Sequence, residues 1–215
     1  MDGMLSHIEE LLEAKNVFER HRKTTKTHAL GIFLYHVGVS TRNCSEVVSS
    51  FESVSHEAIR QWYHKVQYLF KTGKTFRGIV AVDETKIKIQ GKWYILWAAI
   101  DIEKWDILGA WITQERSSIE VYSFLKFILR KCENKPRILV DGGPWYKSAL
   151  NRLKLEWEHV TFGLRNPIEQ WFGILKHRIN LFYRRWPYNA TVETAQQWIN
   201  SFVCLYHLRK RQTNE

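Results

Sequence analysis

The stretch GIVAVDETKIKIQGKWYILWAAID, residues 78–101, marks a change from helical spacing to a period of two. Its alternation through residue 89 predicts a long extended strand, and QGK at 90–92 predicts a hairpin turn. Residues 93–101 predict a second strand, so apolar that we expect both its faces to be covered. ILGAWIT at 107–113 predicts a third strand after another turn. These segments together predict an antiparallel meander.

Helices and strands alternate in the residues that follow the meander. Ser117 and Glu120 form a capping box, which predicts the start of a helix. The later predicted elements are a buried strand at 137–141, a helix at 145–157, a strand at 159–162, a helix starting at Asn166-Pro167 and a last helix from Thr191. Three antiparallel strands followed by alternating helices and strands is the element order of the α/β ribonuclease H-like fold, which we therefore predict.

The segment before the meander has helical apolar spacing over residues 4–70. Ser40 and Ser55 are each placed to cap a helix. Two helices joined by a tight turn, at about residues 40–70, resemble a helix-turn-helix, and a plain helical hairpin is the alternative. The candidate DNA-contacting residues of the second helix are His56, Arg60, Gln61 and His64.

These elements predict a division of the chain into four parts. Residues 1–70 form a helical DNA-binding region, and KTGKTFR at 71–77 is a linker. Residues 78–190 form the ribonuclease H-like core, and residues 191–215 form a C-terminal helix with a basic tail.

Composition excludes several classes of protein. Of 215 residues, 45% are hydrophobic, which is enough for a core. The longest apolar run, Trp93–Ile100, is too short to span a membrane, and the acidic start lacks the pattern of a signal peptide. Three widely spaced cysteines favour neither a disulfide scaffold nor a zinc finger, so we expect buried or idle thiols. We expect a cytoplasmic protein, associated with the nucleoid when on DNA.

The net charge of +10 is unevenly spread. Residues 163–215 contain eight basic and three acidic side chains and thus carry half of the excess. A basic surface attracts polyanions, of which nucleic acid is the commonest. The ten tryptophans and nine tyrosines are suited either to a core or to stacking on bases, and composition does not separate the two.

Three acidic residues fall where a ribonuclease H-like fold would bring them together. Asp83 lies within the first strand, Asp141 follows the fourth strand directly, and Glu169 lies in the first turn of a helix. Taken singly, each has a structural explanation: an edge residue, a turn residue and a helix-dipole partner. Taken together, three carboxylates suit Mg²⁺ or Mn²⁺. Two such ions would promote in-line attack on a phosphodiester by water or a 3′-hydroxyl.

Basic residues extend from the helix of Glu169. Lys176 lies seven residues later, about two helical turns, and so shares a face with Glu169 and either Phe172 or Gly173. We expect Lys176 to contact a phosphate near the acidic site. The residues predicted to extend this basic surface are Arg178, Arg184 and Arg185, and a solvated basic face is the alternative.

Three strings carry a family resemblance: VDETKIKIQGKWYILWAAID, ILVDGG with WY after the proline, and RNPIEQWFGILKHRI. In this order they resemble the IS6-type (IS26/IS240-like) insertion-sequence transposases of the DDE class. The resemblance implies that Asp83, Asp141 and Glu169 are the catalytic, metal-binding triad and that Lys176 is its basic partner. It also implies binding of terminal inverted repeats by the helix-turn-helix, with cleavage and strand transfer of DNA ends. Because two DNA ends must be paired, we expect at least a homodimer when DNA is bound.

The sequence departs from the pattern of that family at one place, and two other functions remain as alternatives. Residues 142–168, between Asp141 and Glu169, form a shorter segment than is usual in the family. Asp101 is a competing acid, which we interpret as a turn residue. The other functions are a transposase-derived DNA-binding regulator without catalysis and a ribonuclease H-like nuclease.

Overall fold

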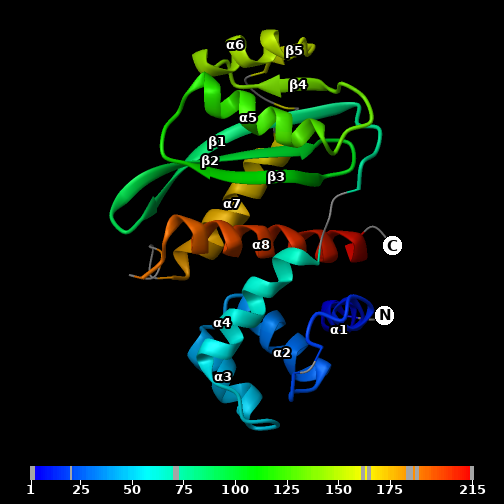
Figure 1. The fold of residues 1–215 in the computed structure, drawn as a ribbon, viewed down its shortest axis with the longest axis vertical. Helices are drawn as coiled ribbons and strands as arrows, with labels where there is room; N and C mark the ends of the chain where they lie inside the picture. Colours follow the sequence, from blue (N-terminus) through cyan, green and yellow to red (C-terminus); the bar gives the residue numbers. More distant parts are fainter. Residues whose placement is uncertain are drawn as a thin grey trace. The chain divides into compact units, whose positions relative to one another are not determined.

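The computed structural model describes residues 3–19, 21–69, 73–160, 163, 166–182, 186 and 189–213, with side chains as far as residue 208. The chain forms two compact units (Figure 1). The helical unit contains Met1–Lys71 and Gln197–Glu215, and the sheet unit contains Thr72–Gln196. None of the described helices is both long enough and apolar enough to cross a membrane.

The helical unit confirms the helices expected before the meander. Its helices are α1 (Met4–Ala14), α2 (Thr25–His36), α3 (Thr41–Ser49), α4 (His56–Lys65), the 3₁₀ turn η1 (Val66–Tyr68) and the later part of α8 (Val192–Thr213). The Ser40 and Ser55 side chains accept hydrogen bonds from the backbone N–H groups of Asn43 and Ala58. Each serine thus satisfies a free N–H at a helix start, as the sequence predicted.

A buried histidine is part of the core of the helical unit. The His28 ring stacks on Phe18 at 3.9 Å between centroids and lies 4.3 Å from the ring of Trp62. Its Nδ1 donates a hydrogen bond of 2.8 Å to the Thr24 carbonyl, which requires the neutral ring to be protonated on Nδ1. Burial lowers the pKa of His28 to about 4. Protonation of this ring therefore opposes folding.

We predict that acid destabilises the helical unit through His28. A histidine with a folded-state pKa of about 4 against 6.5 contributes stability above pH 6.5 that is lost as the pH falls through the folded value. The loss between pH 7 and pH 4 should be about 3 kcal/mol, which amide hydrogen exchange within α2 would measure. His28→Phe keeps the ring packing but cannot titrate, so its acid sensitivity should be smaller. Equal sensitivity in both proteins would refute this role.

The sheet unit contains one mixed sheet of five strands. The strands are β1 (Ile79–Ile89), β2 (Lys92–Asp101), β3 (Asp106–Thr113), β4 (Arg137–Val140) and β5 (Trp157–His159). Their order is β3-β2-β1-β4-β5, with the first three antiparallel and with β4 and β5 added in parallel. The predicted meander is therefore confirmed, and this topology is the ribonuclease H-like α/β fold.

Helices cover both faces of this sheet (Figure 1). Helices α5 (Ser118–Leu129) and α6 (Pro144–Arg152) lie on one face, and α7 (Asn166–Asn180) contacts β1 and β2 from the other. Val80 and Val82 of β1 pack with residues of α5 and α6 in one apolar core. Because side chains alternate along a strand, Ala81 and Asp83 lie on the face of α7.

Two element boundaries differ from the sequence prediction. Helix α6 ends at Arg152, whereas we predicted helix through 157, because Lys154 adopts a left-handed conformation with a φ of 52°. This turn lets Leu155 enter the core, where its side chain is 6% exposed. The fifth strand consequently starts at Trp157, earlier than the predicted 159–162, of which 161 and 162 lie outside the described residues.

All three cysteines are free and buried, as expected.

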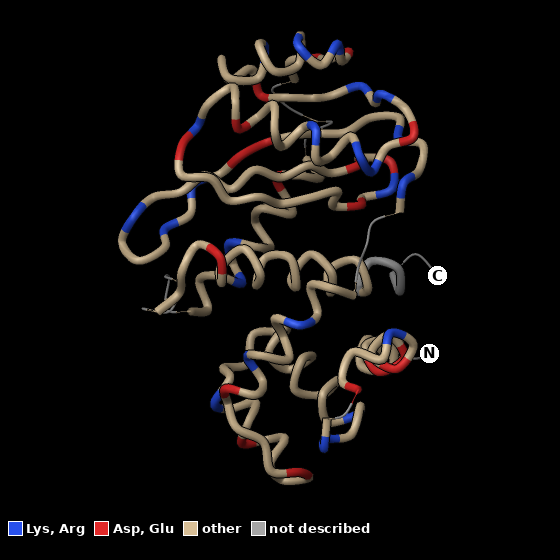
Figure 2. The backbone as a smooth tube through the Cα atoms, viewed as in Figure 1, with Lys and Arg blue, Asp and Glu red and all other residues tan. Residues whose placement is uncertain are grey.

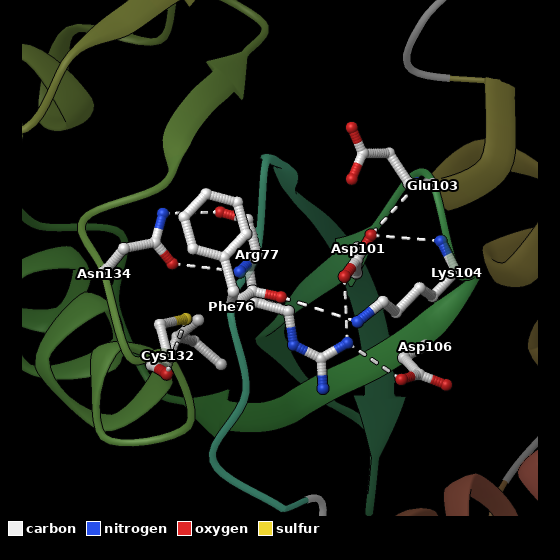
Figure 3. A network of polar contacts seen from close by, with 9 residues as sticks. Phe76, Arg77, Asp101, Glu103, Lys104, Asp106, Cys132 and Asn134 are labelled. Atoms are coloured by element: carbon white, nitrogen blue, oxygen red, sulfur yellow. Dashed lines mark hydrogen bonds and ion pairs between the residues drawn. The ribbon is translucent and has the colours of Figure 1, made fainter.

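A buried ion network fastens the end of the predicted linker to the sheet unit (Figure 3). The Arg77 guanidinium contacts carboxylate oxygens of Asp101 and Asp106, each at 2.8 Å. Asn134 accepts from the Arg77 N–H at 2.9 Å and donates to its carbonyl at 2.7 Å. Burial by itself lowers the pKa of Arg77, but its hydrogen bonds to the two aspartates raise this pKa above its usual value. The segment just before β1 is thus fixed by ion pairs of the Arg77 side chain and by hydrogen bonds of the Arg77 backbone.

Removing Arg77 should destabilise the sheet unit strongly. Arg77→Ala leaves Asp101, which is fully buried, without its ion-pair partner, and such a loss costs roughly 3–5 kcal/mol. Arg137 is a control because its side chain is 44% exposed and pairs with Glu156 and Glu158 at the surface. Arg137→Ala should cost at most about 1 kcal/mol. Urea unfolding of the full chain measures both, and similar costs would contradict a stabilising role for the buried network.

Candidate active site

Three carboxylates converge where β1 lies beside the end of β4. Oxygen atoms of Asp83, Glu84 and Asp141 all lie within 4.8 Å of one another. The parallel register of β1 and β4, with Ala81 opposite Leu139, brings Asp141 level with Asp83. The structure therefore brings together two of the three predicted acids and adds Glu84, which the sequence had not singled out as a site residue. We call these three residues the acidic cluster.

Backbone N–H groups orient the two predicted aspartates. The Asp83 carboxylate, in a residue 8% exposed, accepts a hydrogen bond of 2.8 Å from the N–H of Glu84. Asp141 accepts one of 3.2 Å from the N–H of Gly143. Between them Gly142 has a φ of +81°, and a Cβ atom there would lie 2.7 Å from His159 Nε2. Only glycine fits this turn, so the Asp-Gly pair predicted as a turn is also what presents the Asp141 carboxylate.

Glu84 is held from the opposite face of β1. Its side chain is only 4% exposed, accepts a hydrogen bond from the Tyr146 hydroxyl and lies 3.3 Å from Arg116 Nε. The Arg116 guanidinium in turn lies over the ring of Trp145, at 4.7 Å from its centroid. The sequence contained one indication of these partners. Glu84 alternates with two buried valines, and a carboxylate on a buried face requires a polar partner, here from the helices packed on that face.

The electrostatics of the cluster reflect burial first and close negative charges second. Burial raises the pKa of Glu84, and the charges of Asp141 and Asp83 raise it further, against the Tyr146 hydrogen bond and Arg116. Burial and the nearby Glu84 charge also raise the pKa of Tyr146 well above its usual value, so this hydroxyl stays a donor. The site therefore favours a proton or a cation close to the Glu84 carboxylate.

The donor set fits a hard divalent cation. Within the described chain, the members of this group offer carboxylate oxygens only, without a histidine or cysteine. Oxygen ligands at this spacing suit Mg²⁺ or Mn²⁺ better than zinc.

Glu169, the third predicted acid, lies in the first turn of α7 and is exposed. It is not a member of the acidic cluster. Gly173 and Lys176 are also exposed, whereas Phe172 is buried, so the shared face of the helix is formed with the glycine. Nothing lies within 4 Å of a Cβ built on Gly173. The face between Glu169 and Lys176 is therefore open.

The predicted basic surface beyond Lys176 needs one correction. Arg178 is only 5% exposed, and its guanidinium lies 4.8 Å from the centre of the Phe182 ring. It belongs to the interior of the helix packing and does not extend an exposed surface, because position 178 falls on the buried side of α7 with Leu175. Arg184 and Arg185 lie outside the described residues.

The four predicted contact residues of α4 differ in their surroundings. His56 and Gln61 are exposed. Arg60 makes two hydrogen bonds to the Glu57 carboxylate, at 2.9 and 2.6 Å, and these lower the pKa of Glu57 to about 2. His64 is half-buried and contacts Gln197 at 3.2 Å. The first three therefore offer polar atoms at the surface of the helical unit, and His64 is partly used within it.

The competing acid Asp101 has a structural role. Besides its ion pair with Arg77, it accepts hydrogen bonds from the N–H groups of Glu103 and Lys104, at 3.0 and 3.1 Å (Figure 3). Its interpretation as a turn residue is confirmed.

Comparison with known proteins identifies the family. Residues 78–212 match the DDE domain of the IS240 transposases. The chain belongs to this DDE transposase family. It is also 41% identical over 207 residues to the uncharacterized protein MJ0017 of Methanocaldococcus jannaschii, covering 96% of this chain and 97% of that protein. A transposase for the insertion sequence-like element IS431mec of Staphylococcus aureus is 27% identical, over 90% of this chain and 88% of the relative.

Among solved structures, the simian T-cell lymphotropic virus intasome, in complex with the PP2A regulatory subunit B56 gamma, contains a similar chain. The similarity has a TM-score of 0.48 and 16% identity, over 82% of this transposase and 66% of that chain. The HTLV-2 integrase catalytic core with magnesium gives a TM-score of 0.40 and 21% identity, over 51% and 74%.

Divalent cations should stabilise this DDE transposase through the acidic cluster. Adding MgCl₂ or MnCl₂ at 100 times the dissociation constant should add about 2.7 kcal/mol of stability, seen as a rise in Tm. Asp83→Asn and Asp141→Asn should abolish the rise, whereas Glu133→Gln, an exposed glutamate outside the cluster, should keep it. A rise that survives both asparagine variants would place the cation elsewhere.

Proposed function

We propose that this transposase binds the terminal inverted repeats of its insertion sequence and catalyses metal-dependent DNA cleavage and strand transfer, with two Mg²⁺ or Mn²⁺ ions as cofactors. The observation that carries the proposal is the meeting of Asp83 and Asp141 in a chain of the DDE family. The substrate is the phosphodiester at the end of the element, and the attacking group is water or a DNA 3′-hydroxyl. One P–O bond forms as another breaks, so no covalent protein intermediate is required.

Asp83, Asp141 and Glu169 are the proposed cation ligands. When bound, the cations supply activation of the attacking oxygen and stabilisation of the leaving oxygen. The protein keeps two of these ligands in place through backbone N–H groups, donated to Asp83 and Asp141. Pre-oriented ligands reduce the reorganisation that the reaction would otherwise require.

The assignment of Glu169 is supported by the placement of its helix. Helix α7 contacts β1 and β2, and it covers the face of the sheet toward which Asp83 points. Glu169 is exposed at the start of α7, and Lys176 follows two turns later on the same open face. We propose that Glu169 completes the ligand set and that Lys176 binds a phosphate of the DNA beside it.

Recognition of the repeat is proposed for the helix-turn-helix formed by α3 and α4. His56 and Gln61 are exposed on α4 and suit contacts with base edges. Arg60 is proposed to contact DNA beside them, oriented by Glu57. His64 is proposed at the margin of this surface. Because two ends of the element must be paired, the active form on DNA is proposed to be a dimer or a larger assembly.

Substitution of the triad should separate chemistry from binding. Asp83→Asn, Asp141→Asn and Glu169→Gln should each reduce strand joining about a thousand-fold or more, because each removes a ligand for charge stabilisation worth several kcal/mol. Binding of the repeat, measured by gel shift in EDTA, should stay close to that of the wild type. The assay uses the full chain and labelled duplexes that carry the ends of the element.

Glu133→Gln is the matched control, because it removes one exposed carboxylate outside the acidic cluster. Joining by Glu169→Gln at the wild-type rate would remove Glu169 from the triad. Specific binding by a wild-type chain that cuts no DNA in Mg²⁺ or Mn²⁺ would instead indicate a regulator.

A further inference from the structure

Strands β1 and β2 continue past the acidic cluster as a tight hairpin (Figure 1). Ile89 pairs with Lys92, so Gln90 and Gly91 alone form the turn. Both turn residues have positive φ, 49° and 79°, as in the two-residue turns that match the twist of paired strands. The hairpin is therefore a defined extension of the sheet and holds its side chains in fixed register.

The two faces of this hairpin have opposite character. Ile87 and Ile89 are 5% and 1% exposed, so one face is anchored in the interior. Lys86, Lys88 and Trp93 are exposed on the other face. Lys88 and Trp93 are direct cross-strand partners, and the lysine Nζ lies 5.6 Å from the centre of the indole ring. Figure 2 shows the basic residues gathered on this hairpin.

The exposed face continues along β1 to Glu84, the member of the acidic cluster on that side of the strand. Lys86 and Lys88 alternate with Glu84 on the same face of β1, at about 7 Å and 14 Å along the strand from it. Arg116, which is 32% exposed and pairs with Glu84, adds positive charge at the inner end. A polyanion lying along Lys88 and Lys86 would thus approach the acidic cluster from the side of β1 on which Arg116 lies.

We infer that Lys86, Lys88 and Trp93, here called the hairpin strip, bind the DNA backbone beside the reacting phosphodiester and stack on an unpaired base there. This inference rests on the proposed function, whose reacting site it extends. The two lysines supply charge to phosphates irrespective of sequence. Trp93 is 61% exposed, and its indole offers a stacking surface next to a cation, the combination that binds single-stranded nucleic acid.

Salt dependence of binding tests the lysines. The full chain is titrated in EDTA with a random-sequence duplex that ends in a short single-stranded 3′ tail, over a range of salt. The double variant Lys86→Ala, Lys88→Ala should lower the slope of log affinity against log salt by about 2, because each phosphate contact contributes about 0.9. Lys126→Ala with Arg130→Ala removes equal charge from exposed positions in α5 and directly after it, and should leave the slope unchanged. An unchanged slope in the hairpin variant overturns the inference.

Stacking is tested on Trp93. Trp93→Ala should weaken binding of the tailed duplex about 5- to 100-fold and leave the blunt duplex nearly unaffected, and Trp93→Phe should restore most of the loss. An equal loss on both DNAs, or no loss on either, overturns stacking. Melting curves should match the wild type, because the side chain is mostly exposed.

The two proposals fail in different ways. If the wild type joins DNA ends and both hairpin variants bind and join like it, the hairpin strip is wrong and the proposed function stands. If the slope and tail effects appear but the wild type cuts no DNA with Mg²⁺ or Mn²⁺, the strip is right as a DNA-binding surface and the proposed function is wrong.

Discussion

Repulsion among closely spaced carboxylates is the constraint on which the candidate site depends. Oxygen atoms of Asp83, Glu84 and Asp141 lie within 4.8 Å of one another at the junction of two strands. Burial raises the pKa of Glu84, and the like charges of Asp141 and Asp83 raise it further. Arg116, Tyr146 and backbone N–H groups offset part of this cost. A divalent cation would offset the rest, in agreement with the cation binding proposed for this site.

The topology of the sheet makes this crowding possible. Strand β1 is central and pairs antiparallel with β2 but parallel with β4, so the carboxyl end of β4 delivers Asp141 to the middle of β1. Consecutive residues of β1 then serve opposite faces. Asp83 points toward the layer that contains α7, while Glu84 points toward α5 and α6 and ties β1 to Tyr146 of α6. A single strand, β1, thereby contributes carboxylates of the site on both of its faces.

Local patterns were enough to predict the meander, the serine caps, the position of Asp83 within β1 and that of Asp141 directly after β4. The partners of Glu84 were not predicted, because Arg116 and Tyr146 are distant in sequence and meet it only after the layers pack. The early end of α6 depends on one left-handed residue, Lys154, whose residue type does not signal it. The burial of Arg178 was not predicted, because a charge pattern does not reveal that this position falls on the buried side of α7.

The sheet unit contains two groups of carboxylates, the Asp101–Asp106 pair and the acidic cluster, and only the acidic cluster is suited to binding a metal ion. Asp101 and Asp106 share Arg77, whose hydrogen bonds raise the arginine pKa, so their charge is met by a protein cation (Figure 3). In the acidic cluster, burial and the charges of Asp141 and Asp83 raise the pKa of Glu84 despite Arg116, so a bound cation would favour the ionised form of this carboxylate. A buried aspartate already matched by arginine stabilises the fold and has little to gain from a metal ion. Three carboxylates whose oxygens lie within 4.8 Å of one another gain more from a cation, which is why Asp83 and Asp141 are the candidates for binding one.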